Sequence, residues 1–282
     1  MGEFHDRMQS DLRLARKASG TQSEYLAHAR RFVAFYRRPP TELGEAEVRQ
    51  YLHHLIEERK ASVYTQKMAT AGIKFLYSVT LQRPEVVAGI PWPKVVDPLP
   101  AILDPSEVSP LFAAACSLVV RAGMMLGYAA GLRVSEVCAL RVGDLDAKRS
   151  AIVVRGGKGG KDRQTLLSPL LHEQLRRYWL AVRPAGPWLL PGSKPEAPLD
   201  RRVLQNGIRL AVQKVGLRKR ITFHSLRHSF ATHMLEAGVD LRVIQSMLGH
   251  ASIGTTTRYL QVRSDLLAKL PDPLALLRSR PG

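Results

Sequence analysis

The sequence predicts a mainly α-helical protein with a small antiparallel β-sheet, an α+β fold that divides into two domains. Apolar residues recur at helical spacing along most of the chain, which indicates a succession of amphipathic helices. Two short β-rich runs, residues 151–155 and 163–167, flank a glycine-rich turn and predict one β-hairpin. Four prolines fall within residues 91–100. Because proline continues neither a helix nor an inner strand, we predict a domain boundary near residue 100.

The first predicted domain, residues 1–97, is helical throughout. Thr21 is expected to cap a helix whose apolar side is rich in aromatic residues. Residues 46–56 and 63–79 repeat the helical pattern, with large apolar side chains three and four positions apart. A proline-rich linker over residues 98–103 is expected to follow.

The second predicted domain, residues 104–282, opens with a helix start signal. Asp104 is an N-cap residue, and Pro105 occupies the first turn. Helices are expected to continue to about residue 141, before the hairpin. After the hairpin, the periodicity predicts helices over about residues 168–181, 200–215, 222–237, 240–248 and 252–260. A short amphipathic segment over about residues 264–278 lies in a C-terminal tail, about residues 264–282.

The charge of the chain predicts a polyanionic partner. A net charge of +18 at pH 7 arises from 42 basic and 24 acidic residues, and residues 98–282 carry +14 of it. Nucleic acid is the default partner for such an excess. The densest basic run, residues 201–220, contains no acidic residue. Its seven basic side chains and Lys161 in the glycine-rich turn are candidates for contacts with DNA phosphates. The seven are Arg201, Arg202, Arg209, Lys214, Arg218, Lys219 and Arg220.

The cysteines and the apolar runs indicate a location in the cytoplasm. Cys116 and Cys138 lie in apolar helical stretches, and we expect both to be buried free thiols, as in a reducing compartment. The most apolar run, residues 111–132, has Arg121 at its middle, which favours a buried core over a membrane span. The N-terminus shows no signal-peptide core.

Two segments carry residues suited to phosphate chemistry. The glycine-rich turn presents Lys158 and Lys161, which suit contact with a phosphate backbone or form a solvated tip; it does not match a P-loop. His224 and Arg227 lie beside an apolar helical stripe, where the arginine would neutralise a phosphate and the histidine would exchange a proton. A zinc site at His224 and His228 is the alternative, and the adjacent arginine and the absence of a carboxylate cluster argue against it.

A further candidate segment follows at the end of the predicted helix 240–248. Gly249 is expected to end that helix and Ser252 to cap the next one, with His250 between them and Tyr259 beyond. A single histidine or tyrosine in such a place is more often structural than catalytic. His250 and Tyr259 become candidates for catalytic residues only in combination with the basic residues upstream.

In chain order, this combination resembles the tyrosine recombinase family, in its Xer-type and phage or integron integrase branches. The elements are Arg133, Lys158, His224-x-x-Arg227, Leu248-Gly249-His250 and Tyr259. The resemblance covers about residues 104–262, and Tyr259 lies nine residues after His250, as the family expects. It implies a helical SAM-like core-binding domain and a catalytic domain that together form a clamp around DNA.

The resemblance also implies a role for each of six catalytic residues. Arg133 and Arg227 would hold the non-bridging phosphate oxygens, and His250 would donate a hydrogen bond to the phosphate. Tyr259, whose ordinary pKa is about 10, would be the nucleophile, with His224 as its base. Lys158 would protonate the departing sugar oxygen, with Lys161 as the competing lysine. Glu136 is expected to lie behind these residues, near Arg133 or a histidine.

The activity implied is site-specific DNA recombination through a 3′-phosphotyrosyl intermediate, with no metal, ATP or other cofactor. The partners implied are a double-stranded DNA site, bound by a dimer, and a tetramer of the chain in the synapse. The C-terminal tail would dock on a neighbouring protomer or on its own domain. The resemblance does not indicate whether an accessory protein takes part. Such a protein would be bacterial or phage-encoded and associated with the nucleoid in the cytoplasm, with no membrane contact. The alternatives are a type IB topoisomerase-like enzyme, a relative that only binds DNA, and a metal-dependent nuclease.

Overall fold

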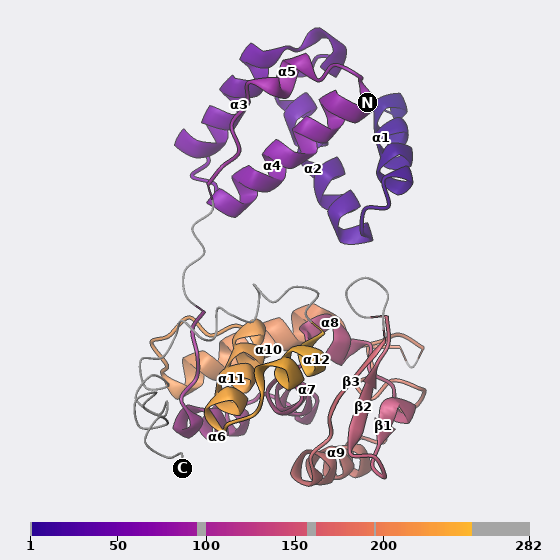
Figure 1. Ribbon diagram of the computed structural model, residues 1–282, viewed down its shortest axis with the longest axis vertical. Helices are drawn as coiled ribbons and strands as arrows, with labels where there is room; N and C mark the ends of the chain where they lie inside the picture. The colour runs from indigo at the N-terminus through magenta and orange to yellow at the C-terminus, as the bar shows by residue number, and fades with distance from the viewer. Residues whose placement is uncertain (1, 95–99, 157–161, 195, 250–282) are drawn as a thin grey trace, which may run out of the picture. The chain divides into compact units, whose positions relative to one another are not determined.

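Residues 2–94, 100–156, 162–194 and 196–249 are described by a computed structural model. The chain divides into two units, Met1–Pro98 and Leu99–Gly282 (Figure 1). The described residues are mainly helical and include one three-stranded antiparallel sheet. The predicted α+β fold class is therefore confirmed. No helix among the described residues is long and apolar enough to span a membrane.

The first unit is built from helices alone in its described part. They are α1 (Gly2–Leu14), α2 (Ser19–Tyr36), the 3-10 turn η1 (Pro40–Glu42), α3 (Glu45–Glu57), α4 (Val63–Phe75), the π-helical turn η2 (Leu76–Thr80) and α5 (Glu85–Ala88). The predicted helices 46–56 and 63–79 correspond to α3 and to α4 with η2. The predicted cap at Thr21 is wrong, because the N-cap of α2 is Ala18, three residues earlier, and it makes no side-chain cap bond.

Aromatic rings form the centre of this unit. The fully buried ring of Phe32 meets the rings of Tyr51 and Tyr77 edge-on, with centroids 5.4 and 6.1 Å apart. Helices α2 and α4 cross closely at Gly72, where an added Cβ would lie 2.9 Å from the backbone oxygen of Tyr25. A glycine on α4 thus permits a backbone approach that places the aromatic residues of α2 in the core.

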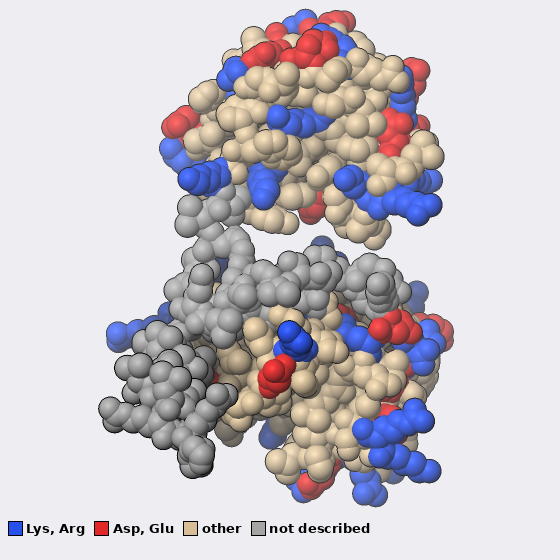
Figure 2. Space-filling model, in the orientation of Figure 1, with Lys and Arg blue, Asp and Glu red and all other residues tan. Residues whose placement is uncertain are grey.

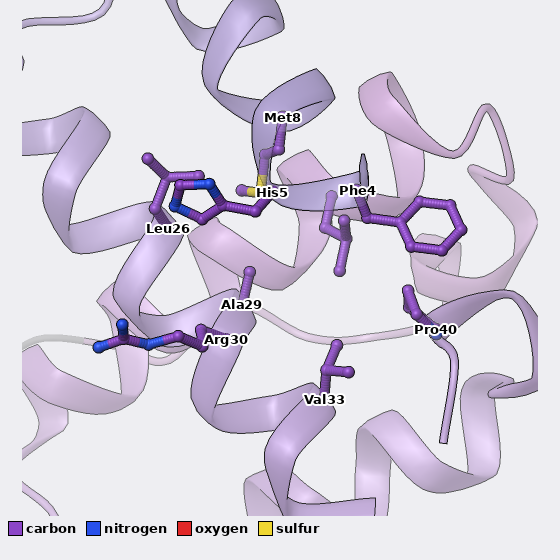
Figure 3. A pocket seen from close by; sticks show the side chains of 9 residues that line it. Phe4, His5, Met8, Leu26, Ala29, Arg30, Val33 and Pro40 are labelled. Atoms are coloured by element: carbon purple, nitrogen blue, oxygen red, sulfur yellow. The ribbon is translucent and has the colours of Figure 1, made fainter. Parts of the chain in front are cut away.

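A small cavity lies in the same unit, between side chains of α1, α2, η1 and η2 (Figure 3). Its volume is about 20 Å³, and its lining is mainly apolar. That space holds about one water molecule. The cavity is therefore a packing feature and too small for an organic ligand.

The second unit combines a helical layer with the sheet (Figure 1). Its elements are α6 (Pro105–Ala113), α7 (Leu118–Ala129), α8 (Val134–Cys138), η3 (Val142–Asp144), β1 (Leu145–Asp146), β2 (Ala151–Val154), β3 (Arg163–Leu166), α9 (Pro169–Val182), α10 (Arg201–Val215), α11 (Phe223–Glu236) and α12 (Leu241–Leu248). Helix α7 contacts α6, α8, α9, α10 and α11, and α12 packs against β3. The main apolar core of the unit lies around α7.

Local capping chemistry sets several of the helix ends. The Asp104 carboxylate accepts a hydrogen bond from the Ser106 backbone N–H (3.1 Å), and Glu107 accepts one from the Asp104 backbone N–H (2.7 Å). This capping box satisfies donors that a helix N-terminus leaves open. Helix α12 ends at Gly249, which adopts a left-handed φ of 63°. The predicted helix boundaries at these two places are confirmed, while the predicted segments 252–260 and 264–278 lie outside the described residues.

The sheet contains the predicted hairpin and one further strand. Strands β2 and β3 pair antiparallel, with Ala151 opposite Leu166 and Val154 opposite Arg163. The base of the turn is closed by the Gly156 backbone N–H, which donates to an Asp162 carboxylate oxygen (2.8 Å). Strand β1, which has only two residues, pairs with β2 and was not predicted. The hairpin is confirmed, and its turn, residues 157–161, lies outside the described residues.

The two cysteines differ in their surroundings. Cys138 is buried in the core around α7, and burial raises the pKa of its thiol to about 11. Cys116 is exposed, at the turn between α6 and α7. The prediction that both thiols are buried is therefore wrong for Cys116, because the chain turns outward between these two helices.

Candidate active site

Glu136 is the buried carboxylate around which the basic residues of the second unit gather. It lies in α8, directly after Arg133, and its side chain is 9 % exposed. One carboxylate oxygen accepts a hydrogen bond from the Arg133 backbone N–H and the other accepts one from Arg133 Nη1, both at 2.8 Å. The start of α8 therefore fixes Glu136 and Arg133 relative to each other.

A second arginine reaches the same carboxylate from the hairpin. Arg163 is the first residue of β3, and its Nη1 and Nη2 donate to Oε1 and Oε2 of Glu136, each at 2.8 Å. This paired geometry is the strong form of an arginine–carboxylate contact. Arg163 Nε donates in addition to the backbone oxygen of Met247 (2.8 Å), in the last turn of α12.

A third arginine, Arg227 of α11, is fully buried beside the same carboxylate. Its Nη1 lies 3.8 Å from Glu136 Oε2 and donates to the backbone oxygen of Gly131 (2.6 Å). Its Nη2 donates to the backbone oxygen of Leu248 (2.6 Å). The apolar stripe predicted next to Arg227 is present, with Phe230 among its buried residues. Arg227 itself lies deeper than that stripe suggested.

We call these four residues the arginine centre: Glu136, Arg133, Arg163 and Arg227. Three guanidinium groups share one carboxylate, so these residues together carry a charge of +2. Positive charge that is poorly solvated and uncompensated is unfavourable, and a bound anion relieves it. Arg133 is the member most open to such an anion, since its side chain is 25 % exposed against 10 % for Arg163 and 0 % for Arg227.

The charges of the arginine centre set the pKa of Glu136. Burial alone would raise the pKa of this carboxyl group, but the hydrogen bonds from Arg163 and from the Arg133 backbone outweigh it. The pKa is held at about 2. Glu136 therefore stays ionised at any ordinary pH and fixes the arginines around it.

His224 lies one helical turn before Arg227, on the exposed side of α11. Its ring meets the ring of His228 edge-on, with centroids 4.4 Å apart. The pKa of His224 is lowered, first by the protein atoms that displace water from it and then by the charges of Arg227 and Arg133. His224 is therefore mostly neutral at pH 7, the state in which an imidazole accepts a proton.

A cleft of about 600 Å³ opens beside these residues. Arg133 and His224 line it, and so do Arg209 of α10 and Arg220 of the segment before α11. Two of the predicted DNA-contacting arginines therefore converge with two predicted catalytic residues. A cleft with three arginines suits a phosphate-bearing polymer.

All seven basic residues predicted in 201–220 are exposed. Helix α10 buries its apolar face, so its charged residues project from the other side. Lys219 differs from the rest, because its ammonium donates to Glu107 (2.8 Å) and thereby connects to the first turn of α6.

Figure 2 shows acidic side chains interspersed with Lys and Arg on the displayed face of each unit.

Four predicted residues lie outside the described part of the chain: Lys158, Lys161, His250 and Tyr259. The described residues bring Arg133, Glu136, His224 and Arg227 together. Arg163 was not predicted, although it follows Lys161 by two residues on the strand that leaves the turn. A charged residue at the first position of a short strand was the available signal, but its partners come from α8 and α12, far away in the sequence.

Among the described residues, no group of three or more His, Cys, Asp or Glu side chains has the arrangement of a metal site. The pair of rings at His224 and His228 belongs to no such group in this part of the chain.

The ionisation of Glu136 gives the second unit a pH dependence that can be measured. The folded-state pKa of about 2 lies below the ordinary value of 4.5, so ionised Glu136 stabilises the fold above about pH 4.5. That stabilisation is lost as the pH falls toward 2. We expect the free energy of unfolding of the wild type to decrease between pH 5 and pH 2 by up to ~3 kcal/mol more than that of Glu136→Gln.

Urea unfolding followed by circular dichroism across this pH range measures the difference. Glu173→Gln is the control, because Glu173 is a half-exposed carboxylate on α9 that pairs with Arg177 at the surface. This control should follow the wild-type pH dependence. The same pH dependence in Glu136→Gln as in the wild type would contradict the low pKa of Glu136.

The fold and the site together define a class of protein. A helical unit precedes a mixed unit in which Arg133 of the arginine centre and His224 line a basic cleft. This arrangement suits an enzyme that acts on a nucleic-acid phosphodiester. Residues 101–265 match the phage integrase family, and residues 4–85 match the N-terminal SAM-like domain of phage integrases. The chain belongs to the phage integrase family of tyrosine recombinases.

Two relatives with similar sequences agree with this membership. An integrase/recombinase of Sinorhizobium fredii is 38 % identical over 278 residues, covering 98 % of this chain and 90 % of that protein. Tyrosine recombinase XerA of Pyrococcus horikoshii is 38 % identical over 189 residues, covering 66 % of each chain. The resemblance inferred from the sequence motifs is confirmed.

Solved structures show the same fold. The crystal structure of XerA recombinase aligns over 100 % of this chain and 99 % of that chain, with 30 % identity and a TM-score of 0.53. A lambda integrase dimer bound to a core site aligns over 96 % of this chain and 79 % of that chain, with a TM-score of 0.73. Its identity is 19 %, so this likeness concerns the fold alone. As a tyrosine-type site-specific recombinase, the chain cleaves and rejoins DNA strands by transesterification.

Proposed function

We propose that Arg133 and Arg227 neutralise the scissile phosphate while the Tyr259 oxygen attacks phosphorus. The bond from phosphorus to the 5′ oxygen of the leaving strand breaks, which leaves a 3′-phosphotyrosyl link and a free 5′-hydroxyl. The observation that carries this proposal is the charge of +2 on the arginine centre. Fixed positive groups that face developing negative charge are among the largest contributions to catalysis.

Protons move at two atoms in this scheme. The Tyr259 hydroxyl proton passes to His224, whose lowered pKa keeps it neutral and able to accept. Lys158 donates a proton to the departing 5′ oxygen, and His250 donates a hydrogen bond to the phosphate. In the rejoining step the 5′-hydroxyl attacks the phosphotyrosine, and each proton returns to its origin. The link conserves the phosphodiester bond energy, so rejoining needs no ATP, metal or other cofactor.

Access to the phosphate differs between the two arginines. Arg133 opens on the cleft, whereas Arg227 is buried and donates to two backbone carbonyls. Direct contact between Arg227 and the phosphate requires its surroundings to open when DNA binds. In the described arrangement Arg227 acts on the phosphate through its charge.

The DNA duplex is proposed to lie in a clamp formed by the two domains, 1–97 and 104–282, joined by the linker 98–103. Arg209 and Arg220 contact phosphates beside the cleft, and the exposed basic residues of α10 extend this track. Lys161 in the turn of the hairpin adds a further phosphate contact. Lys219 contributes less, because its ammonium is paired with Glu107.

Assembly is proposed to follow the pattern of the solved relatives. Lambda integrase has been solved as a dimer on a core site and as a tetramer on a Holliday junction. We expect a dimer of this chain on each DNA site and a tetramer in the synapse, with the tail, about residues 264–282, on a neighbouring protomer. The location proposed is the nucleoid in the cytoplasm.

A covalent trapping experiment tests the proposed function. Genomic DNA fragments that the protein captures covalently are sequenced, and the most frequent one is prepared as a nicked duplex that loses the 5′-hydroxyl strand after cleavage. A covalent adduct on a denaturing gel, formed in EDTA, is the expected result. Activity that disappears in EDTA would indicate a metal-dependent nuclease. Relaxation of any plasmid without strand exchange would indicate a topoisomerase-like enzyme.

Lys158→Ala tests the assignment of the general acid. We expect slow cleavage of an ordinary nicked duplex and near wild-type cleavage of one with a 5′-bridging phosphorothiolate, because a thiolate leaves without protonation. Single-turnover rates on the two substrates measure this rescue. Lys161→Ala is the control and should show no such difference. Rescue of Lys161→Ala alone would move the role of the acid to Lys161.

A further inference from the structure

We propose that Arg163 is a positioning residue that holds the catalytic hairpin, α8 and α12 in one arrangement through a single guanidinium group. The inference rests on the proposed function, because its effect is exerted on the residues that act on the phosphate. Arg163 itself touches none of the reacting atoms in this scheme.

The contacts of Arg163 account for all three nitrogens of its guanidinium. Nη1 and Nη2 donate to the two oxygens of Glu136, and Nε donates to the backbone oxygen of Met247, each at 2.8 Å. The side chains of Arg163 and Glu136 are 10 % and 9 % exposed. A planar group with fixed donor directions can serve two separate elements at once, which a lysine ammonium at the same place does poorly.

On α12, Arg163 and Arg227 together satisfy the end of the helix. The last carbonyl groups of a helix lack intrahelical partners and form its negative pole. Met247 offers its carbonyl oxygen to Arg163 and Leu248 offers its own to Arg227. An added Cβ on Gly249 would lie 2.6 Å from Arg163 Cδ, so the chain passes directly against this side chain. The segment that leads to His250 therefore starts from a point fixed by two arginines.

On the hairpin, Arg163 marks the last pair of residues before the turn. It stands opposite Val154 in the β2–β3 ladder and five residues after Lys158. Its contact with Glu136 thus connects the base of the lysine-bearing turn to the start of α8, where Arg133 lies. Thr165 on the same strand donates independently to the backbone oxygen of Ala130 (2.8 Å), so β3 keeps an attachment when Arg163 is replaced.

Arg163 also determines how Glu136 is shared. In the described arrangement Glu136 is 2.8 Å from Arg133 and Arg163 but 3.8 Å from Arg227. Removal of Arg163 would free two hydrogen-bonding positions on Glu136 and allow the carboxylate to turn toward Arg227. The positive charge available to the phosphate would then fall, and the geometry of Arg133 would change with it.

Single-turnover cleavage of the captured nicked duplex, at saturating protein, tests the inference. For Arg163→Gln we expect a cleavage rate about 100-fold below the wild type, since small displacements of catalytic groups have effects of that size. DNA affinity, measured by fluorescence anisotropy, should change less than about threefold, because Arg163 is not a phosphate contact. Arg163→Lys keeps the charge and should recover part of the lost rate.

The matched control is Arg177→Gln, which removes an exposed arginine from an ion pair with Glu173 on α9. It should cleave at the wild-type rate. Thermal unfolding establishes that each variant is folded, and Arg163→Lys serves as the test variant if Arg163→Gln does not fold. If Arg163 acts through Glu136, its replacement has little further effect once Glu136 is already replaced. The double variant Arg163→Gln/Glu136→Gln should therefore cleave less than about twofold more slowly than Glu136→Gln alone.

Each outcome decides one question. Wild-type cleavage rates in both Arg163 variants would overturn the inference while leaving the proposed function in place. A weakened DNA affinity with an unchanged rate at saturation would make Arg163 a DNA contact and also overturn it. If the fall in cleavage rate in the double variant equals the product of the falls in the two single variants, Arg163 does not act through Glu136. Failure of the wild type to form any adduct would instead overturn the proposed function on which the inference rests.

Discussion

Replacement of Tyr259 by phenylalanine is expected to abolish the covalent protein–DNA adduct. Phenylalanine keeps the ring and loses the oxygen that attacks phosphorus, so the first chemical step has no nucleophile. We expect the single-turnover cleavage rate to fall about 10⁴-fold or more, as it does when other enzymes lose their nucleophile. Denaturing gel electrophoresis of the protein with the nicked duplex measures the adduct.

The matched control for this experiment is Tyr128→Phe. Tyr128 lies in α7, and its hydroxyl group forms a hydrogen bond with His233 Nδ1 (2.9 Å), away from the arginine centre. Tyr128→Phe should retain the adduct. DNA affinity should be nearly unchanged in both variants, because the phosphate contacts remain. An adduct that persists in Tyr259→Phe would show that another residue is the nucleophile.

Replacement of Arg227 by glutamine is expected to reduce both activity and stability. The variant loses one of the three positive charges beside Glu136, and comparable electrostatic groups change catalytic rates about 10²- to 10³-fold. It also removes the donors to the backbone oxygens of Gly131 and Leu248, both in buried surroundings. An unsatisfied buried acceptor costs on the order of 1–3 kcal/mol of folding free energy. Single-turnover cleavage and urea unfolding measure the two effects.

Arg133→Gln separates the catalytic effect of Arg227 from its structural one. Arg133 is partly exposed, and its guanidinium donates to Glu136 (2.8 Å) rather than to buried backbone carbonyls in the described part of the chain. We expect Arg133→Gln to lose a similar factor in rate with a smaller loss of stability. Equal stability in Arg227→Gln and the wild type would contradict the structural role of Arg227. An unchanged cleavage rate in either variant would contradict the proposed phosphate neutralisation.

Features governed by short-range interactions were predictable from the sequence. The helix start at Asp104, the helix end at Gly249 and the hairpin around the glycine-rich turn follow from capping, left-handed backbone geometry and strand patterning. Strand β1 was not predicted because two residues are too few to show an alternating pattern. Residues 1–97 were predicted to be helical as a whole, but α1 was not delimited as a separate helix, although Met8 and Leu12 carry its buried face.

The arrangement of the arginine centre was only partly predictable. The motif placed Arg133, Glu136, His224 and Arg227 in one site, but the complete burial of Arg227 depends on carbonyl oxygens from Gly131 and Leu248. These acceptors lie 96 and 21 residues away along the chain. Periodicity within a single helix carries no information about such partners. Contacts between distant segments therefore decide which arginine opens on the cleft and which one is buried.

The most direct test of the account is to identify the residue that carries the DNA. The adduct is formed in EDTA, digested with nuclease and trypsin, and analysed by mass spectrometry. The account predicts a 3′-phosphoryl nucleotide on Tyr259, in the tryptic peptide 259–263. A nucleotide attached to any other residue, or cleavage that needs an added metal ion and leaves no adduct, would contradict it.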